Sequence, residues 1–126
     1  MMTGHAPKPR MPSSDLTPGS VVWATLDPVR GREQSGHRPA LVVASARYLE
    51  TVTSLTIVVP ITSVDRGWIN HVRLDGEHGL DRASWAMTEQ PRTLARDRLT
   101  SIAGRANNRC LAEIRMWLAD FLELQP

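Results

Sequence analysis

A chain of 126 residues is long enough for one domain whose core needs neither disulfides nor a structural metal, and its single cysteine, Cys110, excludes an internal disulfide. The formal net charge of +2 excludes a general attraction to nucleic acid, so any polyanion binding must come from a local cluster of charges. No apolar stretch has the length of a membrane span, and the N-terminus lacks the apolar region of a secretory signal, so we expect a soluble, cytoplasmic protein.

The chain begins with a segment that we do not expect to fold. Residues 1–16 carry three prolines among small polar side chains and show no apolar periodicity, which predicts a disordered tail. The folded domain is then expected over residues 17–126. Its first strand, residues 21–26, is apolar on both faces and ends at the strand-breaking pair Asp27 and Pro28.

Short strands dominate the middle of the chain. Further strands are expected at residues 40–44, 55–61, 68–74, 84–89 and 100–103. The first two of these are continuous β-branched runs, joined by a polar connection over residues 47–54. One short helical turn is expected within residues 93–99.

The pattern changes period near the C-terminus. From Asn107, which can cap a helix, apolar residues recur at three- and four-residue spacing and predict one amphipathic helix. Cys110 falls in this helix and is expected in the core or an interface. Several short strands followed by a terminal helix predict a mainly β fold with a C-terminal α-helix, a small β-barrel or curved sheet with the helix packed on it.

The connection between the first two strands is unusually rich in polar chemistry. It contains Arg30, Arg32, Glu33, Gln34, His37 and Arg38. A tight hairpin needs only two to five turn residues, so this surplus predicts a ligand-binding loop.

The remaining chemistry favours a phosphate ligand without a metal. The chain has no Walker loop, GxGxxG, GxSxG elbow or HExxH, and its four histidines lack the spacing of metal ligands. We therefore expect no cofactor. His71 and His78 are expected to be exposed at a turn. RNA can be cleaved without a metal because its ribose 2′-OH supplies the nucleophile. Arg38 can donate two hydrogen bonds to phosphate oxygens, and His37 is the side chain best suited to exchange a proton near neutrality.

Each of these residues also has a simpler interpretation. His37 alone is more often a solvated loop residue, and Arg38 could be an exposed residue at the start of a strand. Four other polar candidates could merely form hydrogen bonds with free backbone groups or be ordinary polar residues of loops: Thr62, Ser63, Gln90 and Arg92. Most of the tryptophans are expected in the core, and one of the four is expected on a surface where a base could stack: Trp23, Trp68, Trp85 and Trp117.

Four segments in the expected order resemble the MazF/PemK family of bacterial toxins, which are sequence-specific messenger-RNA interferases. The segments are PGSVVWATLDPVRGREQSGHRPALVVAS, VVPITS, EQPRTLARDRL and IAGRANNRCLAEIRMWLADFL. The resemblance covers about residues 18 to 124. Its most specific part is DPxxGxEQxGxRP between two strands, because composition alone rarely produces that combination.

The resemblance implies a compact SH3-like β-barrel of the MazF/CcdB toxin type, which forms a homodimer and binds single-stranded RNA in a groove across it. It implies a metal-independent endoribonuclease that leaves 2′,3′-cyclic phosphate and 5′-OH ends and is inhibited by a cognate antitoxin protein. It places acid–base chemistry and phosphate binding on Arg38, and a catalytic role on Thr62. Substrate binding falls on Glu33, Gln34 and Gln90.

Three neighbours of these positions complete the predicted site. Ser63 and Arg92 adjoin the matched motifs, and His37 is inferred from its chemistry alone, so all three are predicted to bind RNA. The general base stays open, because a guanidinium remains protonated at ordinary pH. Two alternatives also stay open: a toxin of the same fold that inhibits a topoisomerase by protein contact, and an inactive paralogue that only binds RNA or antitoxin.

Overall fold

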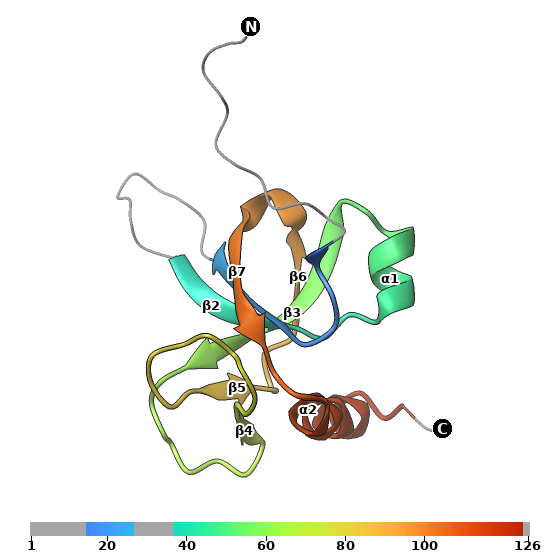
Figure 1. The fold of residues 1–126 in the computed structure, drawn as a ribbon. Helices are drawn as coiled ribbons and strands as arrows, with labels where there is room; N and C mark the ends of the chain where they lie inside the picture. The colour runs from blue at the N-terminus through green and yellow to red at the C-terminus, as the bar shows by residue number, and fades with distance from the viewer. Residues whose placement is uncertain (1–14, 27–36, 125–126) are drawn as a thin grey trace, which may run out of the picture.

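The computed structural model describes residues 15–26 and 37–124. Within these ranges the strands are β1 (Ser20–Thr25), β2 (His37–Val42), β3 (Leu55–Thr62), β4 (His71–Arg73), β5 (Trp85–Met87), β6 (Arg92–Ala95) and β7 (Leu99–Arg105). The α-helices are α1 (Ala46–Thr51) and α2 (Asn108–Phe121), and a 3-10 turn (Arg96–Arg98) joins β6 to β7 (Figure 1). Glu33 and Gln34 lie outside the described residues, as does most of the predicted ligand-binding loop.

The strands form one curved antiparallel sheet in the order β4-β5-β3-β2-β1-β7, with β6 also paired to β3. This confirms the predicted mainly β fold with a C-terminal helix. The described strands end at β4 on one side and at β7 on the other, so the sheet curls without closing into a complete barrel (Figure 1).

Strand β3 connects the two halves of the sheet. One of its edges pairs with β2, where Pro60 lies opposite Ala40. Its other edge pairs with β6 over residues 55–58 and with β5 at residues 61–62. Pro60 lies in the gap between those two partners, where its missing N–H leaves no ladder bond unmade. Strand β3 therefore changes its neighbour on this edge from β6 to β5 just before Thr62.

Alternation along the central strands creates a core on each face of the sheet. Val22, Val42 and Val58 pack in one cluster with Leu49 of α1. The neighbouring residues Val21, Leu41 and Val59 face the other way and pack in a second cluster with Ile114 of α2. The C-terminal helix therefore packs on its own sheet, as its apolar stripe predicts.

The predicted start of the C-terminal helix is confirmed. Asn107 is the N-cap of α2, and its side-chain oxygen accepts a hydrogen bond from the backbone N–H of Cys110 at 2.9 Å. No helix among the described residues is long and apolar enough to cross a membrane.

Helix α1 replaces part of the polar connection that we expected over residues 47–54. Ser45 caps its first turn by accepting from the N–H of Tyr48 at 3.0 Å, and Leu49 anchors it in the core. Its C-terminal end depends on a distant side chain, because Arg96 donates to the carbonyl oxygens of Leu49 at 2.6 Å and Val52 at 3.0 Å. Six residues are too few to display a helical period, which is why the sequence pattern missed this helix.

The helical turn expected within residues 93–99 is confirmed at Arg96–Arg98, but the residues before it form β6, a strand that was not predicted and that pairs with β3. One further expectation was wrong in detail. Leu16, which we assigned to the tail, is only 5% exposed and belongs to the core cluster on the α1 face.

Candidate functional site

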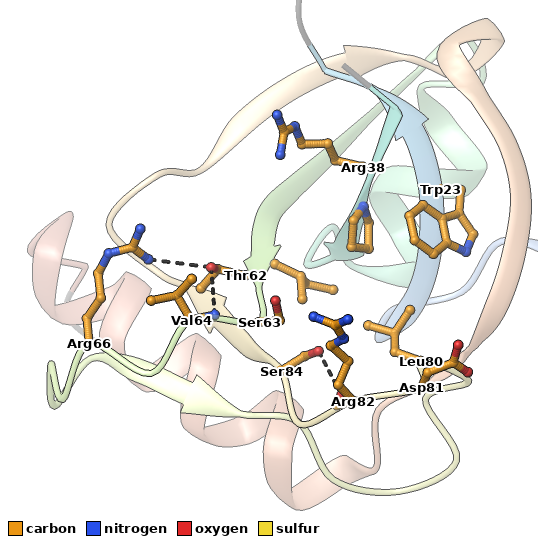
Figure 2. A pocket seen from close by; sticks show the side chains of 12 residues that line it. Trp23, Arg38, Thr62, Ser63, Val64, Arg66, Leu80, Asp81, Arg82 and Ser84 are labelled. Atoms are coloured by element: carbon orange, nitrogen blue, oxygen red, sulfur yellow. Dashed lines mark hydrogen bonds between the residues drawn. The ribbon is translucent and has the colours of Figure 1, made fainter. Parts of the chain in front are cut away.

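Arg38 and Thr62 lie at the same end of the neighbouring strands β2 and β3. The pairing of these strands ends with Ala40 opposite Pro60, and Arg38 and Thr62 each lie two residues beyond that pair. A cavity of about 510 Å³ opens beside them (Figure 2). Its lining residues are Trp23, Arg38, Pro39, Ile61, Thr62, Ser63, Val64, Arg66, Leu80, Asp81, Arg82 and Ser84. We call it the Arg38 cavity.

Three guanidinium groups come to this cavity from different segments. Arg38 enters from β2, Arg66 from the loop after β3, and Arg82 from the loop before β5. Figure 2 shows Thr62 and Ser63 between them. Asp81 is the acidic residue of the lining, so the cavity carries an excess of positive charge suited to an anion.

The hydroxyl of Thr62 is held by two donors. Its Oγ1 accepts from the backbone N–H of Val64 at 3.1 Å and from Nη1 of Arg66 at 3.4 Å. Because both partners donate, the hydrogen of the hydroxyl remains available for an oxygen atom of a ligand. Thr62 can therefore act as a hydrogen-bond donor into the cavity.

The loop that carries Arg82 is fastened to the rest of the fold through its backbone. The carbonyl oxygen of Glu77 accepts from the N–H of Arg105 in β7 at 3.0 Å. Gly79 has a φ of +82°, and any Cβ there would collide with the carbonyl group of Ala103. Gly104 is equally constrained, since a Cβ would collide with the carbonyl oxygen of Glu77. The loop and β7 thus approach as closely as two glycines allow.

His37 lies beside the cavity and does not line it. Its ring packs on Trp23, with ring centroids 5.6 Å apart, and its Nε2 lies 2.9 Å from Oγ1 of Thr100. The hydroxyl of Thr100 donates its one hydrogen to the carbonyl oxygen of Trp23 at 3.2 Å, so it accepts from His37. A neutral His37 ring therefore carries its proton on Nε2 and leaves Nδ1 able to accept one.

Gln90 and Arg92 do not reach the Arg38 cavity. Gln90 follows β5 and is exposed, and its backbone N–H donates to the carbonyl oxygen of Met87 at 3.1 Å. Arg92 begins β6, opposite Val58, and is also exposed. Of the predicted site residues that the structure describes, the cavity therefore gathers Arg38, Thr62 and Ser63.

The expectation that His71 is exposed was wrong. Its side chain is only 2% exposed, and its Nε2 lies 3.1 Å from both carboxylate oxygens of Glu89. Burial raises the pKa of Glu89, but hydrogen bonds from His71, a backbone N–H, Gln90 and Asn70 lower it by more, so that pKa lies below its ordinary value. Glu89 is therefore an anion near neutrality, and the Nε2 of His71 donates to it.

Cys110 and the other potential metal ligands form no second site. In the part of the chain that the structure describes, no group of three His, Cys, Asp or Glu side chains is placed to hold a metal ion. Cys110 is buried, as predicted, and its thiol donates to the carbonyl oxygen of Arg73 at 3.6 Å. Burial raises the pKa of this thiol.

The sequence patterns missed several residues of the cavity. Arg82 stands in a loop that only the folded chain brings to this cavity, and Arg66, four residues after Thr62, carries no spacing signal of its contact with the Thr62 hydroxyl. Trp23 alternates along β1 like a core residue, yet it is only partly buried and forms a cavity wall. Trp68 is 51% exposed, in agreement with the expectation that one of the four tryptophans lies on the surface.

The comparisons with known proteins agree with this arrangement of fold and cavity. The family described as "PemK-like, MazF-like toxin of type II toxin-antitoxin system" matches residues 17–122. The chain belongs to this family. The MazF/PemK resemblance of its motifs is thereby confirmed.

Individual relatives of this toxin family match the chain to different extents. It is 35% identical to the endoribonuclease MazF9 of Mycobacterium tuberculosis over 112 residues, which cover 84% of this chain and 95% of that one. It is 34% identical to the endoribonuclease toxin MazF of Escherichia coli over 77 residues, but the match spans only 66% of that protein's length. A structure of MazE-MazF from Deinococcus radiodurans superposes with a TM-score of 0.73 at 30% identity, covering 87% of this chain and 97% of that one.

Proposed function

We propose that this chain is a toxin that acts as a sequence-specific endoribonuclease and that the Arg38 cavity binds the phosphate at which single-stranded messenger RNA is cut. The observation that carries the proposal is that Arg38, Arg66 and Arg82 line the same cavity as Thr62, whose hydroxyl accepts from Arg66. Planar guanidinium groups match phosphate oxygens in geometry and charge. The relatives from M. tuberculosis and E. coli, both named endoribonucleases, support the same function.

The proposed reaction is a transesterification within the RNA. The ribose 2′-oxygen loses its proton and attacks the adjacent phosphorus, the bond from phosphorus to the 5′-oxygen breaks, and the leaving oxygen takes up a proton. The products are a 2′,3′-cyclic phosphate and a 5′-OH. Arg38 and Thr62 would stabilise the charge that builds up on the phosphorane oxygens, with Arg66 and Arg82 adding positive charge. This distribution of charge requires no metal ion.

The other predicted residues would contact the RNA beyond that phosphate. Ser63 adds a second hydroxyl at the cavity, and His37 presents its ring against Trp23 at the edge. Gln90 and Arg92 would bind nucleotides farther along the strand. Glu33 and Gln34 remain predictions from the family motif.

We also propose partners for this toxin. The D. radiodurans relative is recorded as a complex of MazE and MazF, and by analogy a cognate antitoxin would cover the positively charged cavity here. A homodimer would extend the RNA-binding groove across two copies. A protein that cuts messenger RNA and is restrained by an antitoxin would act in the cytoplasm.

The decisive experiment is RNA cleavage in excess EDTA. Purified protein is incubated with a long, mostly unstructured RNA, and product ends are mapped by primer extension and end chemistry. We expect discrete cuts with 5′-OH ends, and Arg38→Ala should lower the rate roughly 10²-fold or more, as loss of a preorganised charge does. Arg47→Ala removes an exposed arginine of α1 outside the cavity and should cleave like the parent chain.

Other outcomes would identify the alternatives. No cleavage by the folded protein across several RNAs, with retained RNA binding, would indicate an inactive binding paralogue. Inhibition of a topoisomerase without cleavage would indicate action by protein contact. Cleavage at the parent rate by Arg38→Ala would remove Arg38 from the mechanism.

A further inference from the structure

An exposed apolar surface lies on the same loop as two residues of the Arg38 cavity. It lies on the segment 63–70 between β3 and β4, which we call the Trp68 loop. Val64 and Arg66 of this loop line the cavity, and two residues farther on the side chain of Trp68 is 51% exposed and that of Ile69 is 80% exposed. A half-exposed indole beside a phosphate-binding cavity is suited to stack with a nucleobase.

The Trp68 ring is held in position by His71. Its centroid lies 4.7 Å from that of the His71 ring, at an interplanar angle of 41°. The N–H of His71 donates to the carbonyl oxygen of Trp68 at 3.1 Å, which fixes the turn between them. His71 is itself fixed by Glu89, whose carboxylate binds Nε2 of the buried ring. An aromatic ring that is already oriented loses little entropy when a base stacks on it.

The same carboxylate also positions Gln90. One Glu89 oxygen, Oε1, accepts from Nδ2 of Asn70 at 2.8 Å, and the other, Oε2, accepts from Nε2 of Gln90 at 3.1 Å. Nε2 of Gln90 also lies 3.7 Å from the sulfur of Met87. The amide nitrogen is thus engaged, whereas the amide oxygen of Gln90 has no hydrogen-bond partner among the described residues. That oxygen is available to accept from an N–H of a ligand.

We propose that Trp68 and Gln90 form a base-binding subsite, in which one base of the RNA stacks on the Trp68 ring and donates a hydrogen bond from its edge to the amide oxygen of Gln90. His71 and Glu89 position both side chains and do not touch the RNA. The subsite rests on the proposed ribonuclease function and would determine part of its sequence preference. It is linked to the Arg38 cavity by the Trp68 loop, because Arg66 of the same loop lines that cavity.

An abasic scan tests the subsite directly. An RNA that spans the mapped cut site carries a 2′-deoxynucleotide at the cut, which blocks the reaction, and each position in turn lacks its base. Binding is measured by fluorescence anisotropy. For the parent chain we expect one position at which base loss weakens binding about 5- to 100-fold, the range typical of base stacking on an aromatic side chain. Trp68→Leu should bind the intact RNA more weakly by a similar factor and lose nothing further at that position.

Three other variants sharpen the test. Trp68→Phe keeps an aromatic face and should retain most of the position-specific effect. Gln90→Leu should relax the base preference at the same position when cleavage products are sequenced. Phe121→Leu removes another partly exposed aromatic ring, on α2, and should leave the abasic profile unchanged.

The outcomes separate this inference from the function on which it rests. If the parent chain neither cleaves nor binds RNA, both are overturned. If it cleaves RNA and Trp68→Leu keeps the parent abasic profile, only the subsite is overturned. If that profile is kept while Trp68→Leu weakens dimerisation or antitoxin binding, Trp68 belongs to a protein interface and the subsite is again overturned.

Discussion

Arg66 reaches back along its own loop to donate from Nη1 to the hydroxyl oxygen of Thr62 over 3.4 Å. The contact is long for a hydrogen bond, and the guanidinium is exposed, so its contribution to the stability of the free protein is small. Its importance lies in position, because it brings a positive charge to a hydroxyl in the cavity that Arg38 also lines.

We therefore expect Arg66→Ala to impair cleavage without destabilising the fold. The rate should fall roughly 10-fold, less than the 10²- to 10³-fold loss for a fully preorganised donor, because solvent screens an exposed charge. Arg66→Lys should recover part of the loss. Single-turnover cleavage with Arg47→Ala as the control measures this, and a parent-like rate for Arg66→Ala would exclude its contribution.

Thr62→Val tests the hydroxyl with almost no change of shape. The substitution removes the donor directed into the cavity and keeps the β-branched side chain that suits the end of β3. Cleavage should fall about 10- to 100-fold while the thermal midpoint changes little, since loss of one hydrogen-bond donor to the transition state has an effect of this order. Ser63→Ala is the comparison, and an equal loss in both variants would argue against a special role for Thr62.

Arg96 should be important for stability and irrelevant to RNA binding. Besides the carbonyl oxygens at the C-terminal end of α1, it binds the carbonyl oxygen of Leu55 through Nε at 2.9 Å. Arg96→Met leaves these carbonyl groups without a donor and should lower the free energy of unfolding by about 2–3 kcal/mol. Arg98→Met, which loses one bond to the carbonyl oxygen of Thr25, should cost less in urea titrations. Equal losses would contradict the proposed capping of α1.

Glu89 should make stability fall in acid. Its pKa is lowered in the folded state, so the stabilisation is present above the ordinary value of 4.5 and is lost as pH falls through the lower folded value. Glu89→Gln lacks this titration. The difference in urea midpoint between the two proteins should therefore be larger at about pH 7 than at about pH 3. A constant difference would mean that the His71–Glu89 contact does not depend on charge.

Cys110 should react slowly in the folded protein. Its thiol is buried and its pKa is raised, so little thiolate is present or accessible near neutrality. Alkylation by iodoacetamide should accelerate sharply once urea unfolds the chain, while Cys110→Ser gives no labelling. Rapid labelling under native conditions would show that the N-terminal end of α2 opens.

The sequence patterns predicted those elements in which core-facing side chains recur at a regular spacing. Strands β1 and β3 alternate over six and eight residues, and α2 repeats its apolar stripe over fourteen. Helix α1 shows no such repeat, and Arg96, which caps it, stands in another part of the chain. The motifs identified Arg38 and Thr62 because each adjoins a predictable strand, whereas Arg66 and Arg82 come from loops whose paths depend on the whole fold.

The burial of His71 could not be predicted from its neighbours in the sequence, because it too depends on contacts between separate parts of the chain. It begins the three-residue strand β4, and its partner Glu89, which is partly exposed, follows the next strand, β5. A pattern of polar residues beside a turn predicts solvent exposure, but pairing of the two strands buries the ring and supplies the carboxylate that compensates it.

The two loops that wall the Arg38 cavity differ in how freely they can change. The Arg82 loop lies against β7 through Gly79 and Gly104, where no larger side chain fits, so insertions or substitutions there would push a cavity wall outwards. The Trp68 loop has no such neighbour at Gly67, although its φ of +73° still favours glycine. Substitutions in the Trp68 loop should therefore disturb the shape of the cavity less than substitutions at the contact between the Arg82 loop and β7.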